Sequence, residues 1–159
     1  MPAPPLDRTD RRILDLLQHN GRLTNVELAE KVSLSPSPCL RRVRALEEAG
    51  VIKRYVALLD PAKVGLVLLA YVTVKLEKRG KMPIEEFTRA VLAWPEVVAC
   101  YSMTGDMDYL LRVQVEDLEH YTRFMMDRLL KHAGVIDAKS NLVLERIKDT
   151  TALPLAHAG

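Results

Sequence analysis

The chain has 159 residues, 48% of them apolar and 28% charged, which is the composition of a globular protein with one ordinary domain or two small ones. Its longest apolar run, Val64 to Val74, is too short to span a bilayer, and the N-terminus lacks the pattern of a signal peptide, so we expect a cytoplasmic protein without a membrane partner. The net charge of +2 lies entirely in the first part, because residues 1–60 hold ten Lys/Arg and eight Asp/Glu whereas residues 61–159 hold thirteen of each.

Caps and the helical spacing of apolar residues predict three helices in the first fifty residues. The first spans about Asp7 to Asn20, with Asp7 as its N-cap. The second, about Asn25 to Lys31, follows a capping box formed by Thr24 and Glu27. The third begins at Pro36, which suits the first helical position, and runs to about Ala49. A short helix, a tight turn and a longer helix form the helix-turn-helix unit.

The third helix has two chemically different sides on a wheel of about 100° per residue. The apolar residues Cys39, Leu40, Val43 and Leu46 lie on one side, and short polar residues and arginines lie opposite. In a major groove Arg41 can pair with guanine through two hydrogen bonds, while flanking basic residues contact phosphates. The β-rich stretch Ile52–Leu59 follows as a wing. We therefore expect contacts with double-stranded DNA from Ser35, Ser37, Pro38, Arg41, Arg42, Arg44, Lys53 and Arg54. A three-helix structural unit with a solvated basic face is the alternative.

The turn-rich connector Asp60–Gly65 predicts a boundary between a DNA-binding domain, residues 1–60, and a second domain, residues 61–159. The second part has the order strand, helix, strand, strand, helix, strand. We expect strands at Leu66–Leu76, Val97–Met103, Asp108–Val115 and Val135–Ile147, and helices at about Pro83–Pro95 and Leu118–Gly134. This order predicts a ferredoxin-like βαββαβ domain with both helices on one face of the sheet. The fold class is thus α+β, with a winged-helix-like helix-turn-helix domain followed by a ferredoxin-like domain.

The first strand of this sheet has apolar residues on both faces. Val67, Leu69 and Tyr71 alternate with the residues that face the helices. Helices cover only one face of such a sheet, and an apolar uncovered face needs a partner. We therefore expect a homodimer packed sheet to sheet, which also supplies two DNA-binding heads for two half-sites.

The turn Thr104-Gly105-Asp106-Met107-Asp108 is the conspicuous polar feature of the second half. Glycine lets a backbone approach a ligand closely, and exposed N–H groups beside two carboxylates can hold both ends of a zwitterion. A hairpin with ordinary turn residues is the simpler interpretation of the same segment.

Four motifs extend over about Leu6 to Leu155: LDRTDRRIL, NGRLTNVELAEKVSLSPSPCLRRVRALEEAGVI, MTGDMDYLLRV and LVLERIKDTTALPL. They resemble the Lrp/AsnC (feast/famine) family of regulators, with a pattern closest to its leucine-responsive and branched-chain-catabolism members. The resemblance implies homodimers that assemble further, often to octamers, and an effector amino acid bound between adjoining dimers. It assigns effector binding or response to Thr104, Gly105, Asp106, Asp108, Leu130, Asn141, Leu142 and Val143. Asn141 stands where close relatives often have a bulkier residue, so the identity of the effector stays open.

We therefore expect a sequence-specific DNA-binding transcriptional regulator that responds to a small effector, an amino acid by the resemblance. An amino-acid sensor or assembly module that acts without DNA is the alternative, and the basic helix-turn-helix argues against it. Enzymatic activity is not expected, because the histidines have no Ser or Cys partner at a recognisable spacing. We therefore expect no catalytic residue and no cofactor. We also expect no metal site, because Cys39 and Cys100 are far apart in the sequence and the two aspartates of the turn lack further ligands.

Overall fold

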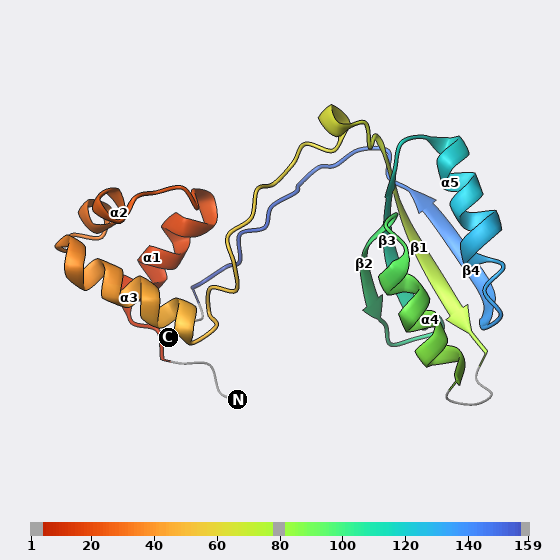
Figure 1. The fold of residues 1–159 in the computed structure, drawn as a ribbon, viewed down its shortest axis with the longest axis horizontal. Helices are drawn as coiled ribbons and strands as arrows, with labels where there is room; N and C mark the ends of the chain where they lie inside the picture. Colours follow the sequence, from red (N-terminus) through yellow and green to blue (C-terminus); the bar gives the residue numbers. More distant parts are fainter. Residues whose placement is uncertain (1–4, 78–81, 157–159) are drawn as a thin grey trace. The chain divides into compact units, whose positions relative to one another are not determined.

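A computed structural model of the chain describes residues 5–77 and 82–156 (Figure 1). Its internal contacts divide it into two compact units. The first unit contains the chain up to Leu58 together with the C-terminal segment from Lys148, and the second contains Leu59–Ile147. The sequence placed that C-terminal segment in the second domain, and this assignment differs from the structure.

The C-terminal segment belongs to the first unit because it packs and bonds there. The side chain of Gln18 forms two hydrogen bonds with the backbone of Leu153: Nε2 donates to the carbonyl oxygen (3.1 Å), and Oε1 accepts from the N–H (2.6 Å). Leu155 packs against the apolar core of the unit. Leu153 and Leu155 belong to neither a helix nor a strand. The spacing of apolar residues in the sequence therefore gives no sign of the contacts that hold them.

Three helices form the first unit, as predicted: α1 (Arg8–His19), α2 (Asn25–Lys31) and α3 (Pro36–Glu48). Both α1 and α2 begin with a capping box. Asp7 and Asp10 exchange backbone-to-carboxylate bonds at α1, and Thr24 and Glu27 do so at α2. The buried core of the unit consists of Ile13, Leu14, Leu28, Ala29, Val32, Cys39 and Leu46.

The predicted strand at Ile52–Leu59 is absent. Residues 53–60 have an irregular backbone and are exposed, and no strand of the described chain pairs with them. The residue types of this segment favour an extended backbone, but a strand also requires a hydrogen-bonded neighbouring strand. Tyr55 holds this segment to the first unit, because its hydroxyl donates to Glu47 Oε1 (2.9 Å). Burial, followed by the bond to Glu47, raises the pKa of Tyr55 to about 12.

The second unit is the predicted ferredoxin-like βαββαβ arrangement. Its strands are β1 (Leu68–Leu76), β2 (Val97–Ser102), β3 (Tyr109–Val115) and β4 (Val135–Leu142), in the antiparallel order β2-β3-β1-β4. Its helices are α4 (Met82–Ala93) and α5 (Leu118–Phe124), which lie on the same face of the sheet (Figure 1). The last strand ends at Leu142 rather than at Ile147, because β1, its pairing partner, begins at Leu68 and offers little backbone beyond that point.

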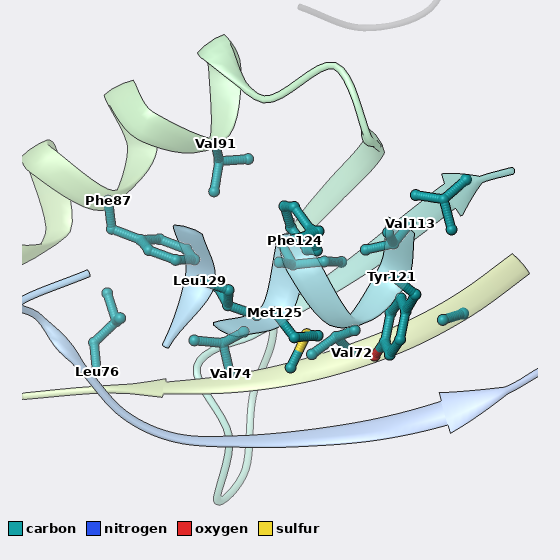
Figure 2. Close-up of a cluster of buried hydrophobic side chains, with 13 residues drawn as sticks. Val72, Val74, Leu76, Phe87, Val91, Val113, Tyr121, Phe124, Met125 and Leu129 are labelled. Atoms are coloured by element: carbon teal, nitrogen blue, oxygen red, sulfur yellow. The ribbon is translucent and has the colours of Figure 1, made fainter. Parts of the chain in front are cut away.

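A continuous apolar layer joins the helices to the sheet. Alternate residues of β1 and β3 are buried against α4 and α5, and Phe87, Phe124 and Leu129 fill the space between them (Figure 2). Helix α5 continues as a π-helical turn, Met125–Leu129, which is labelled η2. The opposite face of the sheet, which we call the open face, carries Leu69, Tyr71, Thr73, Lys75, Leu110, Arg112, Lys139 and Asn141 by strand register.

Candidate DNA interface and effector site

Helix α3 presents an uncovered face with a shallow hollow. Ser37, Arg41, Arg44 and Ala45 are all exposed and lie within about two turns of the helix. Together with Leu40 and Glu48 they line a hollow of about 400 Å³. Within the described part of the chain, neither Arg41 nor Arg44 forms an ion pair. Two guanidinium groups are therefore available to hydrogen-bond acceptors of a ligand, which is the arrangement that the third helix was predicted to have.

The inner side of α3 fixes the orientation of this face. Cys39 and Leu46 are buried in the core, and burial raises the pKa of the Cys39 thiol. Cys39 is thus an apolar packing residue, as predicted, and not a reactive thiolate. Leu40, which the wheel placed on the apolar side of the helix, is 37% exposed and also lines the hollow. The helical wheel did not identify Leu40 and Glu48 as part of the hollow, because it separates an apolar from a polar side and does not resolve residues at the border between them.

Arg42 is held by two carboxylates of the first unit. Its Nη1 lies 2.7 Å from Asp7 Oδ2 and 2.7 Å from Asp10 Oδ1, at the N-terminus of α1. Bonds to Asp10 and then to Asp7 raise the pKa of the Arg42 guanidinium. The pKa of Asp7 is lowered, mainly by its bond from the Asp10 N–H and then by Arg42. Both ion pairs use Nη1 of Arg42, so the carboxylates compete with a phosphate for this guanidinium, and its contact with DNA stays a prediction.

The remaining residues predicted to contact DNA lie at the start of α3 and in the segment after it. Ser35 is the N-cap of α3, but its side chain forms no capping hydrogen bond, so its hydroxyl is not used by the helix. Pro38 is half-buried, and Ser37 is exposed. Lys53 and Arg54 are exposed on the segment that Tyr55 anchors to Glu47. Their contacts with DNA remain predictions.

The polar turn of the second unit joins β2 to β3. Thr104, Gly105 and Asp106 are exposed, and Gly105 has φ of 112°, a conformation that glycine tolerates and other residues rarely adopt. Asp108 differs, because its Oδ2 accepts from the Leu76 N–H (2.8 Å) and its own N–H donates to the Val74 oxygen (2.9 Å). The carboxylate expected to hold an effector is therefore engaged in fixing the turn to β1.

The residues assigned to effector response do not meet within one chain. The turn is bonded to β1 at Val74 and Leu76, whereas Asn141 pairs with Tyr71 and the Val143 N–H donates to Leu69. These two sets of contact points on β1 are three to seven residues apart, which is roughly 10–23 Å along a strand. Leu142 is partly exposed on β4, and Leu130 is exposed just after η2. Within one chain, the turn and the end of β4 therefore bond to different parts of β1.

Two family models match the chain. The winged helix-turn-helix DNA-binding model covers residues 6–53, and the Lrp/AsnC ligand binding domain model covers residues 69–153, more than half of the chain. The chain belongs to the Lrp/AsnC family. It is thus a DNA-binding transcriptional regulator with a C-terminal ligand-binding domain, as the sequence predicted.

Individual members of the Lrp/AsnC family are similar over nearly the whole chain. The leucine-responsive regulatory proteins of Escherichia coli and Salmonella typhimurium are 41% identical over 96% of this chain and 93% of theirs. A transcriptional regulator of Neisseria meningitidis, solved as its L-Met complex, is 52% identical with a TM-score of 0.93, covering 96% of this chain and 98% of that one. An AsnC family regulator of Agrobacterium tumefaciens is 43% identical with a TM-score of 0.89, over 94% and 97% of the two chains.

Across residues 5–77 and 82–156, no three His, Cys, Asp or Glu side chains lie close enough together to hold a metal ion. In the same residues no helix has the length and apolar character needed to cross a bilayer.

Proposed function

We propose that this regulator reads DNA with the exposed face of α3 and that its effector is an α-amino acid with an apolar side chain. The uncovered pair Arg41 and Arg44 carries the first part of the proposal. Arg41 and Ser37 contact base edges, while Arg44, Lys53 and Arg54 contact phosphates. Arg42 is omitted from this set because Asp7 and Asp10 already bind it.

The effector part of the proposal rests on the relatives and on the divided site. The N. meningitidis regulator was solved with L-methionine, and the E. coli relative is named for its response to leucine. Both amino acids are zwitterions with apolar side chains. The exposed N–H groups of the turn at Thr104–Asp106 suit the charged end of such a ligand. Asn141 and Val143 lie too far away on the same chain and would come from another copy.

The open face of the sheet supports an assembly of several copies. Leu69, Tyr71 and Leu110 lie together on it between charged residues, and Tyr101 on β2 is 54% exposed. A homodimer that covers this face buries the apolar centre and keeps the charges at the rim. Dimers that associate further, to octamers as the family resemblance implies, bring the turn of one copy to β4 of another.

A binding experiment with two arginine variants tests the DNA-reading part. An operator is first selected from random duplexes with the wild-type protein. Arg41→Ala is expected to weaken operator binding by about 1–3 kcal/mol while changing the affinity for random DNA less, because a base contact is lost. Arg44→Ala is expected to weaken both alike and to reduce the slope of log affinity against log salt by about one.

Arg123→Ala is the matched control for these two variants. Arg123 is an equally exposed arginine on α5, where it pairs with Glu119 in the adjacent helical turn. Its loss is expected to leave both DNA affinities within about twofold of the wild type, since pairs of this kind contribute little. Unchanged operator affinity in Arg41→Ala would contradict the assignment of α3 as the reading helix.

A further inference from the structure

Gln114 is a buried polar residue of β3 that neither the DNA interface nor the proposed effector site uses. It is 8% exposed and lies on the open side of the sheet, opposite Leu69. Its Nε2 donates both hydrogens, to the carbonyl oxygens of Leu66 (2.6 Å) and Leu68 (3.1 Å). Its Oε1 accepts from Arg146 Nη2 (3.1 Å). The amide is therefore bonded at both ends.

The partners of Gln114 lie within the second unit, near the places where the chain enters and leaves it. The chain enters the second unit at Leu59 and reaches β1 through Leu66, and it leaves the unit after Ile147, next to Arg146. The nitrogen of one side chain holds the entering segment, and the oxygen of the same side chain holds the leaving segment. A displacement of Gln114 thus acts on both covalent connections at once.

A second set of bonds links Gln114 to the helical layer. Its backbone N–H donates to the Glu96 carbonyl oxygen (2.9 Å). Glu96 is also 8% exposed, and its two carboxylate oxygens accept from Arg128 Nη1 at 3.0 and 2.8 Å. His120 Nε2 lies 3.3 Å from the same carboxylate. Bonded groups therefore extend without interruption from η2, through β3, to the connecting segments.

Arg128, at one end of this path, lies close in sequence to a residue assigned to effector response. Arg128 belongs to η2, and Leu130, which the family resemblance assigns to effector response, follows that turn directly. Single π-helical turns inside α-helices occur often at functional sites. Stability alone does not require the path, because an apolar side chain can replace a buried polar network without loss. A role in positioning explains why buried Glu96 and Gln114 are there.

We infer that Gln114, together with Arg146, is a positioning residue that transmits the effector state of the second unit to the DNA-binding unit. The inference rests on the proposed function, since it assumes that an amino acid changes DNA affinity. It predicts that removal of the Gln114 amide separates two properties that the wild type couples: amino-acid binding remains, and its effect on DNA binding is lost.

The experiment compares wild type, Gln114→Met and Tyr121→Phe. Operator affinity is measured with and without saturating L-methionine, and with L-leucine as a second probe, while calorimetry gives the affinity for the amino acid itself. Allosteric couplings are typically about 5- to 150-fold. In Gln114→Met the effect of the amino acid on DNA affinity is expected to fall to about twofold or less, with amino-acid affinity within about threefold of wild type. Tyr121→Phe also removes a hydrogen bond of the second unit, to Ser140 at 2.6 Å, and is expected to keep the full coupling.

Each other outcome overturns a defined part of the argument. If Gln114→Met keeps the wild-type coupling, or if it loses coupling only because it no longer binds the amino acid, the inference is wrong while the proposed function stands. If the wild type responds to neither amino acid, the proposed effector class fails and the inference fails with it. If Gln114→Met does not fold, Arg146→Met is used instead. This variant keeps the Gln114 amide and its bonds to the carbonyl oxygens of Leu66 and Leu68. Full coupling in Arg146→Met would contradict the inference. Arg146→Lys, which retains a donor, is expected to restore most of the coupling.

Discussion

Arg42 shows how two neighbouring carboxylates bind a basic side chain of a helix that the sequence predicts to contact DNA. It is one of three arginines within four residues of α3, and its neighbours Arg41 and Arg44 point to the uncovered face. Asp7 and Asp10 bind it from the first turn of α1, so the same two carboxylates cap one helix and fasten another. The spacing of arginines along α3 was visible in the sequence, but the pairing was not, because it joins residues 35 and 32 positions apart.

The Asp7 carboxylate predicts an acid-sensitive contribution to stability. Its pKa in the folded chain lies below the ordinary value of 3.8, so the folded state favours the ionised form. The contribution is complete above that value and is lost as the pH falls through the lower pKa of the folded state. Asp7→Asn is therefore expected to melt at a lower temperature than wild type at neutral pH, and the difference is expected to shrink as the pH falls below the ordinary pKa of 3.8.

Melting curves between about pH 3 and pH 7 check this expectation. Asp15→Asn on the same helix is the control, because Asp15 is exposed and its carboxylate lies only at 3.7 Å from His19. A difference between Asp7→Asn and wild type that stays constant over the whole range would mean that Asp7 acts through its shape alone. Asparagine is itself a good N-cap, so loss of the cap does not obscure the result.

At the scale of elements, the sequence predicted the helices whose ends are set by neighbouring residues. The two capping boxes and Pro36 placed all three helices of the first unit within a residue or two. Periodicity and turns gave the order and faces of the four strands. The failures have a common cause: Ile52–Leu59 and the end of β4 depend on whether a second strand is available, and the C-terminal segment depends on contacts with α1. Such long-range contacts leave no periodic signal in a single sequence.

The C-terminal segment offers a direct test of its place in the first unit. Leu155 is half-buried against the core, whereas Leu153 is 70% exposed and is bound only through its backbone to Gln18. Leu155→Ala is expected to lower the free energy of unfolding by roughly 1–2 kcal/mol, less than a fully buried leucine. Leu153→Ala is expected to change it by no more than about 0.5 kcal/mol. Urea denaturation followed by the helical circular dichroism signal measures both, and equal effects would contradict the packing described for Leu155.

At the scale of the whole molecule, the residues that the family resemblance assigns to the effector fall into two groups. The turn and the end of β4 lie at opposite ends of β1, and the motif resemblance named both groups without showing that they are apart. Asp108 was assigned to the effector by its place in the motif, but the structure uses it to bind the Leu76 N–H. A single sequence cannot reveal a site that several copies complete, since each copy carries every residue of it.

This division predicts that assembly and effector binding fail together. Tyr71 lies at the centre of the open face, between Arg112 on β3 and Asn141 on β4. Tyr71→Glu places a carboxylate in the face that a second copy is expected to cover, where it would be desolvated without a specific partner. We expect sedimentation to show monomers of this variant. L-methionine and L-leucine should then no longer raise its melting temperature, although we expect them to raise that of the wild type by binding the folded state.

Leu92→Glu is the matched control, because Leu92 on α4 is also a large apolar residue and is 83% exposed. A charge at that position leaves the open face unchanged, so the variant should assemble and respond as the wild type does. The informative contradiction is a monomeric Tyr71→Glu protein that still gains the full melting shift from an amino acid. That result would place a complete effector site within one chain, most simply at the turn itself, and would remove the reason for joining the turn of one copy to β4 of another. Loss of the shift together with the assembly has the opposite meaning: the ligand is then bound by residues that only the oligomer brings within reach of one another.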